Sequence, residues 1–207
     1  MDKQINIVTK PDWVTWDEIK KCLYDAHADN RAKGLNMTHY LWSASKIQEF
    51  IGAHGVMLVA LDENKVVGTA ALAEREGKAW YAKGTYAYMC FAGILPEYRG
   101  LGLYKVLIKE REKIAKSLGY QTILFDTHFE NKIIHNIAKK NGYRFVRFFL
   151  ANSMDHYSVV MVKWLLGSPY SKSYCRWKYL KSILKVRIKT VISLKRIHPL
   201  FSSRFII

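Results

Sequence analysis

The sequence predicts a three-layer α/β domain, in which a mixed, twisted sheet of about seven strands carries helices on both faces, followed by a basic C-terminal helical extension. Short β-prone apolar runs alternate with longer segments whose apolar residues recur at helical spacing. Half of the residues are apolar and 14% are aromatic, so the chain can bury a core. The last acidic residue is Asp155, and the remainder of the chain is strongly basic.

Each element follows from its local pattern. The predicted order is a strand at 4–9, a helix at 15–31, a short helix at 43–51, strands at 56–61 and 65–73, a polar loop at 74–84, a central strand at 86–94, a helix at 103–118, a strand at 122–126, a helix at 131–140, and strands at 143–151 and 157–164. Gly68 interrupts its strand and indicates a bulge. Gly119 suits the C-terminal end of the long helix.

The chain is organised around the turn between the central strand and the long helix. Gly100 and Gly102 allow left-handed backbone angles and a close approach to a ligand. The first turn of a helix collects unpaired N–H groups and the positive end of the helix dipole. The turn therefore predicts an anion site, with phosphate as the usual anion, although an ordinary turn before a helix can carry the same residues.

Two motifs then resemble the GCN5-related N-acetyltransferases. The turn Pro96-x-Tyr98-Arg99-x-x-Gly102 resembles their pyrophosphate motif. Their second motif is matched at its family spacing by Asn131, Ile134, Ala138 and Gly142-Tyr143. The resemblance covers about residues 4–164 and agrees with the predicted order of elements.

The resemblance implies a coenzyme A site, whose pantetheine arm behaves like an added strand. It implies that Asn131 binds the pantetheine or steadies the following loop. The other implied contacts are backbone groups of the central strand for the arm, and the turn for the pyrophosphate: Ala92, Gly93 and Ile94, then Arg99, Gly100, Leu101, Gly102, Leu103, Tyr104 and Lys105.

The implied activity is transfer of an acetyl group from acetyl-CoA to a primary amine, directly and in a ternary complex. The acceptor is not identified; an amino sugar or another small amine fits, and no metal is implied. Two residues depart from the family pattern. Tyr104 stands where the family prefers a small residue, and its side chain either points away or crowds the phosphates. Ala138 replaces the tyrosine that protonates the leaving thiolate in many members, so the alternative is a weak or inactive CoA-binding domain whose basic tail docks on a membrane surface or nucleic acid.

Catalysis needs a base to take a proton from the ammonium. Asp126 is a candidate because it lies five residues before Asn131, and its alternative is a carboxylate that caps the next loop. His128 titrates in the useful range, but a loop histidine without a role is also expected. His135 could replace the missing tyrosine or simply lie partly exposed on its helix.

Structural roles explain the other reactive or aromatic side chains at least as well as functional ones. Cys90 is expected in the core, and Glu97 is expected to be an exposed companion of Arg99. The loop with His39, Tyr40 and Trp42 would form an acceptor wall by resemblance, but such aromatics suit a core equally well.

The net charge of +16 is unevenly placed. Ten basic residues and no acidic residue lie between positions 164 and 207, which divides the chain into an acyltransferase domain at 1–166 and a basic extension at 167–207. A basic amphipathic helix of about 20 residues is predicted there, with lysines on one face and an apolar face formed by Leu180, Ile183, Leu184, Ile188, Val191 and Ile192. The residues from Leu184 to Ile188 also alternate, so a strand is the alternative. Three roles are open: packing on the core or on a second subunit, docking on an anionic membrane with Trp177 and Phe201, or, less favoured, binding nucleic acid.

The three cysteines lack paired metal spacing, and no apolar signal stretch opens the sequence. A cytoplasmic protein is expected, with attachment to the inner membrane face as a variant. The expected partners are a small-molecule amine, an anionic membrane surface through the tail, and a second copy in a homodimer.

Overall fold

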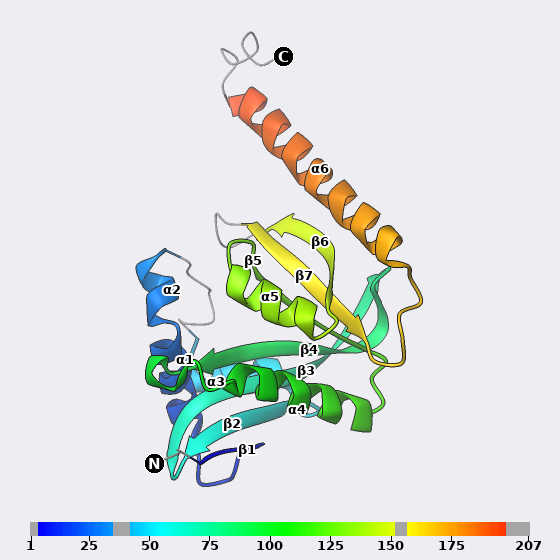
Figure 1. Ribbon diagram of the computed structural model, residues 1–207. Helices are drawn as coiled ribbons and strands as arrows, with labels where there is room; N and C mark the ends of the chain where they lie inside the picture. Colours follow the sequence, from blue (N-terminus) through cyan, green and yellow to red (C-terminus); the bar gives the residue numbers. More distant parts are fainter. Residues whose placement is uncertain (1–3, 35–41, 152–156, 198–207) are drawn as a thin grey trace. The chain divides into compact units, whose positions relative to one another are not determined.

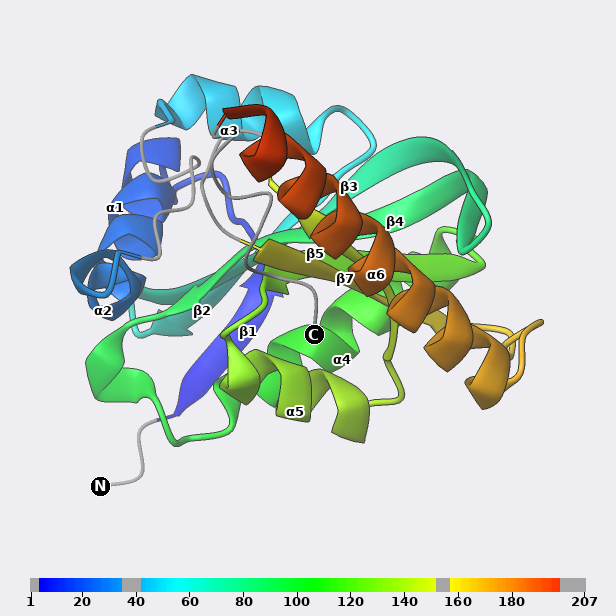
Figure 2. The same ribbon diagram turned by 90° about the horizontal axis from the view of Figure 1, so that it is seen from above.

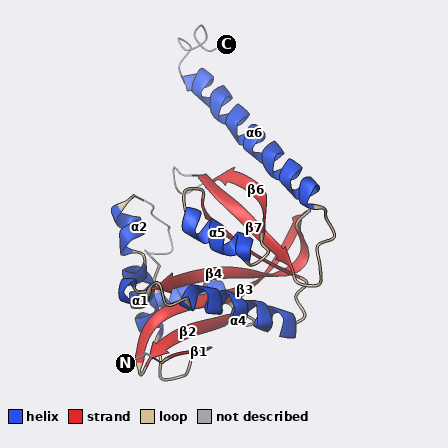
Figure 3. Ribbon diagram, viewed as in Figure 1, coloured by secondary structure: helices blue, strands red, loops and turns tan. Residues whose placement is uncertain are grey.

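The computed structural model describes residues 4–34, 42–151 and 157–197 (Figure 1). Its elements are β1 (Ile5–Thr9), α1 (Trp16–Ala26), α2 (Ala28–Ala32), α3 (Ala44–Ile51), β2 (Val56–Asp62), β3 (Lys65–Ala79), β4 (Ala82–Ile94), the short 3-10 helix η2 (Pro96–Tyr98), α4 (Leu103–Ser117), β5 (Thr122–His128), α5 (Lys132–Lys140), β6 (Arg144–Leu150), β7 (Tyr157–Trp164) and α6 (Lys172–Ile197). The strands form one seven-stranded sheet in the order β1-β2-β3-β4-β5-β7-β6 (Figure 3), which confirms the predicted mixed α/β fold.

The chain divides into two compact units. Unit 1 comprises 1–125 and 162–168, and unit 2 comprises 126–161 and 169–207. In unit 1, β1 to β4 pair antiparallel, and β5 pairs parallel to β4 at Ala87↔Ile123 and Tyr88↔Leu124.

Both faces of the sheet in unit 1 are covered. Every residue of β3 from Val66 to Ala73 is buried, which is typical of a strand packed on both sides. Figure 2 shows α1 and α3 on one face and α4 on the other. The capping box of Thr15 and Glu18 starts α1, whose buried stripe of Ile19, Cys22, Leu23 and Ala26 faces the core.

The prediction of a loop at 74–84 is wrong, because β3 and β4 continue as a hairpin up to Ala79 and Ala82. The charged residues that suggested a loop lie on hairpin arms beyond the core. Arg75 is held there by a 2.5 Å hydrogen bond from its Nη2 to the Phe50 carbonyl, and its guanidinium lies over the Phe50 ring. A Cβ at Gly77 would lie 2.9 Å from the Tyr86 ring, so glycine admits this cross-strand contact.

The predicted single helix at 15–31 is also wrong, because it breaks at His27 into α1 and α2. The bulge expected near Gly68 is confirmed by a shift in the pairing of β2 with β3: Ala60 opposes Gly68, but Leu61 opposes Val66.

Unit 2 contains α5, β6 and the long helix α6. Helix α6 packs on β6: the Tyr179 ring stacks on Phe145 with centroids 5.1 Å apart, and the Phe148 N–H donates to Ser182 Oγ over 2.8 Å. The helix is 26 residues long, against about 20 expected. Its packed stripe contains Cys175, Tyr179 and Ser182. Of the predicted apolar residues, Ile183 is half-buried, whereas Leu180, Leu184 and Ile188 are exposed.

Candidate functional site

The turn before α4 lies in unit 1 and is open. Gly100 and Gly102 both have left-handed backbone angles, with φ of 82° and 76°. Gly102 is the N-cap residue of α4, and it supplies no side chain to the first N–H groups of that helix. The first turn carries no acidic side chain either.

The space that faces the α-carbons of these glycines is open. A Cβ built on Gly100 or Gly102 would meet no atom within 4 Å other than those of its chain neighbours and of the nearby backbone of the glycine's own helix. Amides without a side-chain cap, a positive dipole end and a first turn without acidic residues together suit the predicted pyrophosphate, while the Lys105 N–H already donates to the Gly102 carbonyl over 3.0 Å.

The Tyr104 side chain packs against the core, which answers the question of crowding. Burial raises the pKa of its hydroxyl, while the neighbouring Arg111 guanidinium acts in the opposite direction. Because the Tyr104 ring packs against the core, it does not occupy the space beside the backbone amides of the turn.

The end of β4 contains a β-bulge that the sequence did not reveal. Cys90 opposes Ala71 and Gly93 opposes Thr69, so β4 has one extra residue, and Phe91 has a φ of 48°. Thr69 Oγ1 donates to the Phe91 carbonyl over 2.9 Å.

His27 holds the second carbonyl of the bulge. Its Nε2 lies 3.0 Å from the Ala92 oxygen, and its Nδ1 lies 3.1 Å from Asn30 Nδ2. Burial lowers the pKa of His27 to about 4, against the opposing effect of the Ala92 bond, so the ring is neutral. Because a carbonyl only accepts, Nε2 carries the proton and Nδ1 accepts from Asn30.

Gly93 and Arg99 connect the end of β4 and the following turn to helices α1 and α2. A Cβ on Gly93 would lie 2.8 Å from Ala26 Cβ, so only glycine allows α1 so near. Arg99 donates to the Ala26 carbonyl over 2.8 Å, to Asp29 over 2.5 Å, and more weakly to the Ile94 carbonyl over 3.4 Å. In this structure Arg99 therefore braces the turn from behind, and its contact with a pyrophosphate stays a prediction.

Sequence reasoning missed His27 and Asp29 because both fit the helical pattern that was expected to continue. The only available signal was a histidine and an aspartate close together before Gly34, which is too common to indicate a site.

In unit 2, Asn131 begins α5 and caps it. Its Oδ1 accepts from the Ile134 N–H over 3.3 Å, and its Nδ2 donates to Thr127 Oγ1 over 3.4 Å. These bonds hold the start of α5 and the end of β5, and the predicted contacts of Asn131 with pantetheine or with the following loop stay predictions.

The proposed bases also lie in unit 2. His128 is buried, its Nδ1 accepts from the Glu130 N–H over 3.1 Å, and burial lowers its pKa. That nitrogen is thus occupied in a local turn. Asp126 is half-buried inside β5, which runs two residues further than expected.

The structure corrects the predicted exposure of His135 in α5 and shows where Ala138 lies. His135 was expected to be partly exposed but is 4% exposed, and burial lowers its pKa to about 4. Its Nε2 has no hydrogen-bond partner among the described residues. Ala138 is fully buried, and its methyl side chain has no proton to donate to a thiolate.

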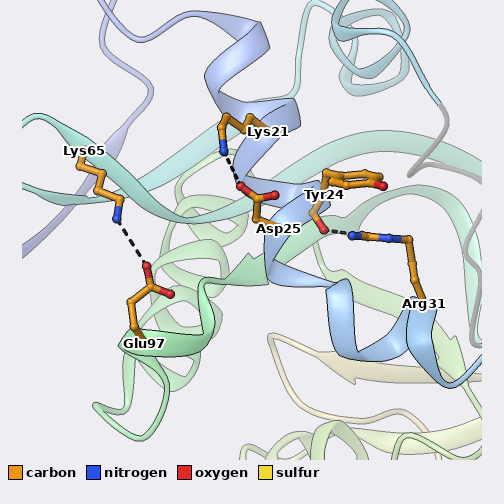
Figure 4. A network of polar contacts seen from close by, with 6 residues as sticks. All are labelled: Lys21, Tyr24, Asp25, Arg31, Lys65 and Glu97. Atoms are coloured by element: carbon orange, nitrogen blue, oxygen red, sulfur yellow. Dashed lines mark hydrogen bonds and ion pairs between the residues drawn. The ribbon is translucent and has the colours of Figure 1, made fainter.

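The remaining candidates have structural roles. Glu97 pairs with Lys65 over 3.4 Å instead of with Arg99, as Figure 4 shows beside the Lys21–Asp25 pair. Cys90 and Trp42 pack against the core, and the Trp42 ring contacts Phe50. His39 and Tyr40 lie outside the described residues. Within 4–34, 42–151 and 157–197, no group of His, Cys, Asp and Glu side chains could hold a metal ion.

Comparisons with known proteins agree with this geometry. The model of the acetyltransferase (GNAT) family matches residues 16–143. A comparison with curated proteins finds no match to the sequence.

Among solved structures, an acetyltransferase from Streptococcus agalactiae is 18% identical with a TM-score of 0.61, covering 79% of this chain and 99% of its own. The ribosomal-protein-S18-alanine N-acetyltransferase from Escherichia coli is 12% identical with a TM-score of 0.59, covering 81% and 99%. NAA60 from Arabidopsis thaliana, in complex with acetyl-CoA, is 16% identical with a TM-score of 0.58, covering 79% and 100%.

Proposed function

Because the chain belongs to the acetyltransferase (GNAT) family, we propose that it moves an acetyl group from acetyl-CoA to a primary amine by direct transfer in a ternary complex. The observation that carries this proposal is the open start of α4, where Gly102 leaves the first amides of the helix without a side-chain cap. The Arabidopsis structure, which has the same fold, holds acetyl-CoA.

The donor substrate supplies the reactive thioester, and the protein supplies positions and proton transfer. The backbone from Gly100 to Lys105 is proposed to hold the pyrophosphate, and the segment Ala92–Ile94 the pantetheine arm. An N–H near Ile94 would polarise the thioester carbonyl at no cost in charge. The amine nitrogen forms the new C–N bond, the C–S bond breaks, and the sulfur leaves as a thiolate.

Two protons leave the acceptor nitrogen in this reaction. We propose Asp126, directly or through a water molecule, as the group that takes the first proton from the acceptor ammonium, with His128 as the less favoured candidate because its Nδ1 is occupied. Since the methyl side chain of Ala138 has no proton to give, water is proposed to carry the second proton, which the nitrogen loses as the amide forms, to the departing thiolate.

The acceptor is proposed to be a small amine, with an amino sugar as one candidate. Solved structures of this fold include both an aminoglycoside 6'-acetyltransferase and the ribosomal-protein-S18-alanine N-acetyltransferase from Escherichia coli, so the fold alone does not identify the acceptor. All three cysteines are free thiols, which supports a cytoplasmic location. No helix in the described parts of the chain is long and apolar enough to cross a membrane.

The test is release of free thiol from acetyl-CoA with a panel of amino sugars, polyamines and peptides. We expect release that depends on the amine, and acetyl-CoA binding by calorimetry. Absence of both would contradict the proposal. Binding without turnover on any amine would favour the second candidate, an inactive CoA-binding domain, which the buried Ala138 supports.

Replacing the proposed base gives a sharper test. Asp126→Asn should lower kcat on the order of 100-fold, as loss of a general base does, and leave acetyl-CoA affinity unchanged. Glu130→Gln is the matched control, because Glu130 is an exposed carboxylate in the same segment. Equal activity of both variants would rule out Asp126 as the base.

A further inference from the structure

Helix α6 has a second, exposed apolar stripe. Packing on β6 uses one face of the helix, which includes Cys175, Tyr179 and Ser182. On the opposite face, large apolar side chains recur at intervals of three and four residues, which places them in one row. They are Trp177 at 52% exposure, Leu180 at 53%, Leu184 at 59% and Ile188 at 49%.

Basic side chains border this stripe. Lys178, Lys181, Lys185 and Lys189 repeat the same spacing one residue later, so they follow one edge of the stripe. Arg176 and Arg187 lie along the other edge, three helical turns apart. The Trp177 ring is covered by the ammonium groups of Lys178 at 5.3 Å and Lys181 at 5.2 Å.

We propose that this face of α6, defined by the stripe and its basic borders, docks on an anionic lipid surface with the helix lying in the plane of the membrane. An apolar row about 17 Å long would enter the boundary between headgroups and acyl chains. The flanking cations would meet lipid phosphates and carboxylates. The inference does not depend on the proposed acetyl transfer.

Other occupants fit the same face less well. A second copy of the chain would bring together two helices that contain no acidic residue, and their charges would repel. Nucleic acid would use the cations and an aromatic ring for stacking, but it gives no benefit to three aliphatic side chains in the middle of the face. A bilayer uses both the cations and the aliphatic row.

The experiment measures co-sedimentation of the full chain with vesicles of phosphatidylcholine alone and of phosphatidylcholine with phosphatidylserine. We expect binding only to the second kind, weakened by salt. The variant Leu180→Ser/Leu184→Ser/Ile188→Ser should bind at least about tenfold more weakly. The variant Lys181→Gln/Lys185→Gln/Arg187→Gln should bind on the order of 100-fold more weakly.

Leu166→Ser is the control, because Leu166 is 80% exposed and lies outside α6. Its binding should equal that of the parent chain, and circular dichroism should show the same helix content in all variants. The proposal is overturned if phosphatidylserine vesicles are not bound at low salt, or if the serine variant binds as well as the parent. It is also overturned if the same substitutions instead abolish a dimer or binding to single-stranded nucleic acid while vesicle binding persists.

Discussion

Two helices of this chain follow strands of the sheet after short connections, and they begin differently. Helix α4 starts at Gly102, which has no side chain, and it carries no acidic residue in its first turn. Helix α5 starts at Asn131, whose side chain accepts from the Ile134 N–H. The start of α4 has no side-chain cap and is available to a ligand, whereas at the start of α5 the Asn131 side chain already accepts a hydrogen bond from a backbone N–H.

Leaving the start of α4 uncapped has a cost in stability. An uncapped helix start forgoes about 1 kcal/mol that a polar cap provides. Contacts near the turn are made by Arg99, which bonds to Ala26 and Asp29, and by His27, which bonds to the Ala92 carbonyl. These contacts hold the turn and the end of β4 without placing a side-chain cap on the first amides of α4.

The largest effect is expected from closing the open start. Gly102→Asp places a carboxylate at the positive end of α4, so acetyl-CoA should bind on the order of 100-fold more weakly by calorimetry. Gly119→Asp is the control, because Gly119 follows α4 with a similar φ of 80° and equally open surroundings. If both variants bind alike, the turn is not the pyrophosphate site.

The supports of the open turn should make the protein sensitive to acid. Because the folded-state pKa of His27 is about 4, the unfolded chain binds more protons as the pH falls below its ordinary value of 6.5. Stability should thus be lost between pH 6.5 and 4, with about 2 kcal/mol from His27 by pH 5. Buried His135 adds to the loss in the same window.

The variant His27→Gln keeps a donor for the Ala92 carbonyl but does not titrate. Urea unfolding at pH 7 and pH 5 should show a smaller difference for this variant than for the parent. His54→Gln, at an exposed histidine, should behave as the parent does. Identical pH dependence in all three proteins would contradict the role assigned to His27.

A smaller effect is expected at the capped start. Asn131→Ala should lower the free energy of unfolding by about 1 kcal/mol, and Asn131→Asp should restore most of it, since an acceptor for the Ile134 N–H returns. Measuring acetyl-CoA binding by the two variants then distinguishes the capping role of Asn131 from its predicted contact with pantetheine. Weak binding by both would assign the amide to pantetheine, whereas recovery with Asp would limit Asn131 to capping.

The smallest effect is expected at the rim of the open turn. Glu97 and Lys65 are both more than half exposed, so Glu97→Gln should change the free energy of unfolding by less than about 0.5 kcal/mol. Thiol release should be unchanged as well. A large loss of activity would return Glu97 to the list of candidate bases.

The sequence predicted what depends on local patterns. Periodicity and turn residues act over a few neighbours. They therefore allowed us to predict the order of most strands and helices, the glycine turn and the bulge beside Gly68. The motif at Asn131 also placed the start of α5 correctly.

What depends on distant contacts could not be predicted. The break at His27 exists because its ring reaches Ala92, 65 positions away. The hairpin arms around Arg75 are held by Phe50, which lies in α3. Which apolar residues of α6 pack could not be predicted, because that helix has apolar residues on two sides and the contact with β6 decides which side is buried.

The extra residue in β4 has a consequence for how the chain tolerates change. Removing Ala92 would equalise the two strands between Thr69 and Ala71, so the bulge would close and the left-handed φ of Phe91 would be lost. Substitutions at this point alter one side chain at a time, whereas this deletion would remove the carbonyl that His27 binds and displace the one that Thr69 binds. Loss of one amino acid here should therefore be far less tolerable than replacement of any one of its neighbours.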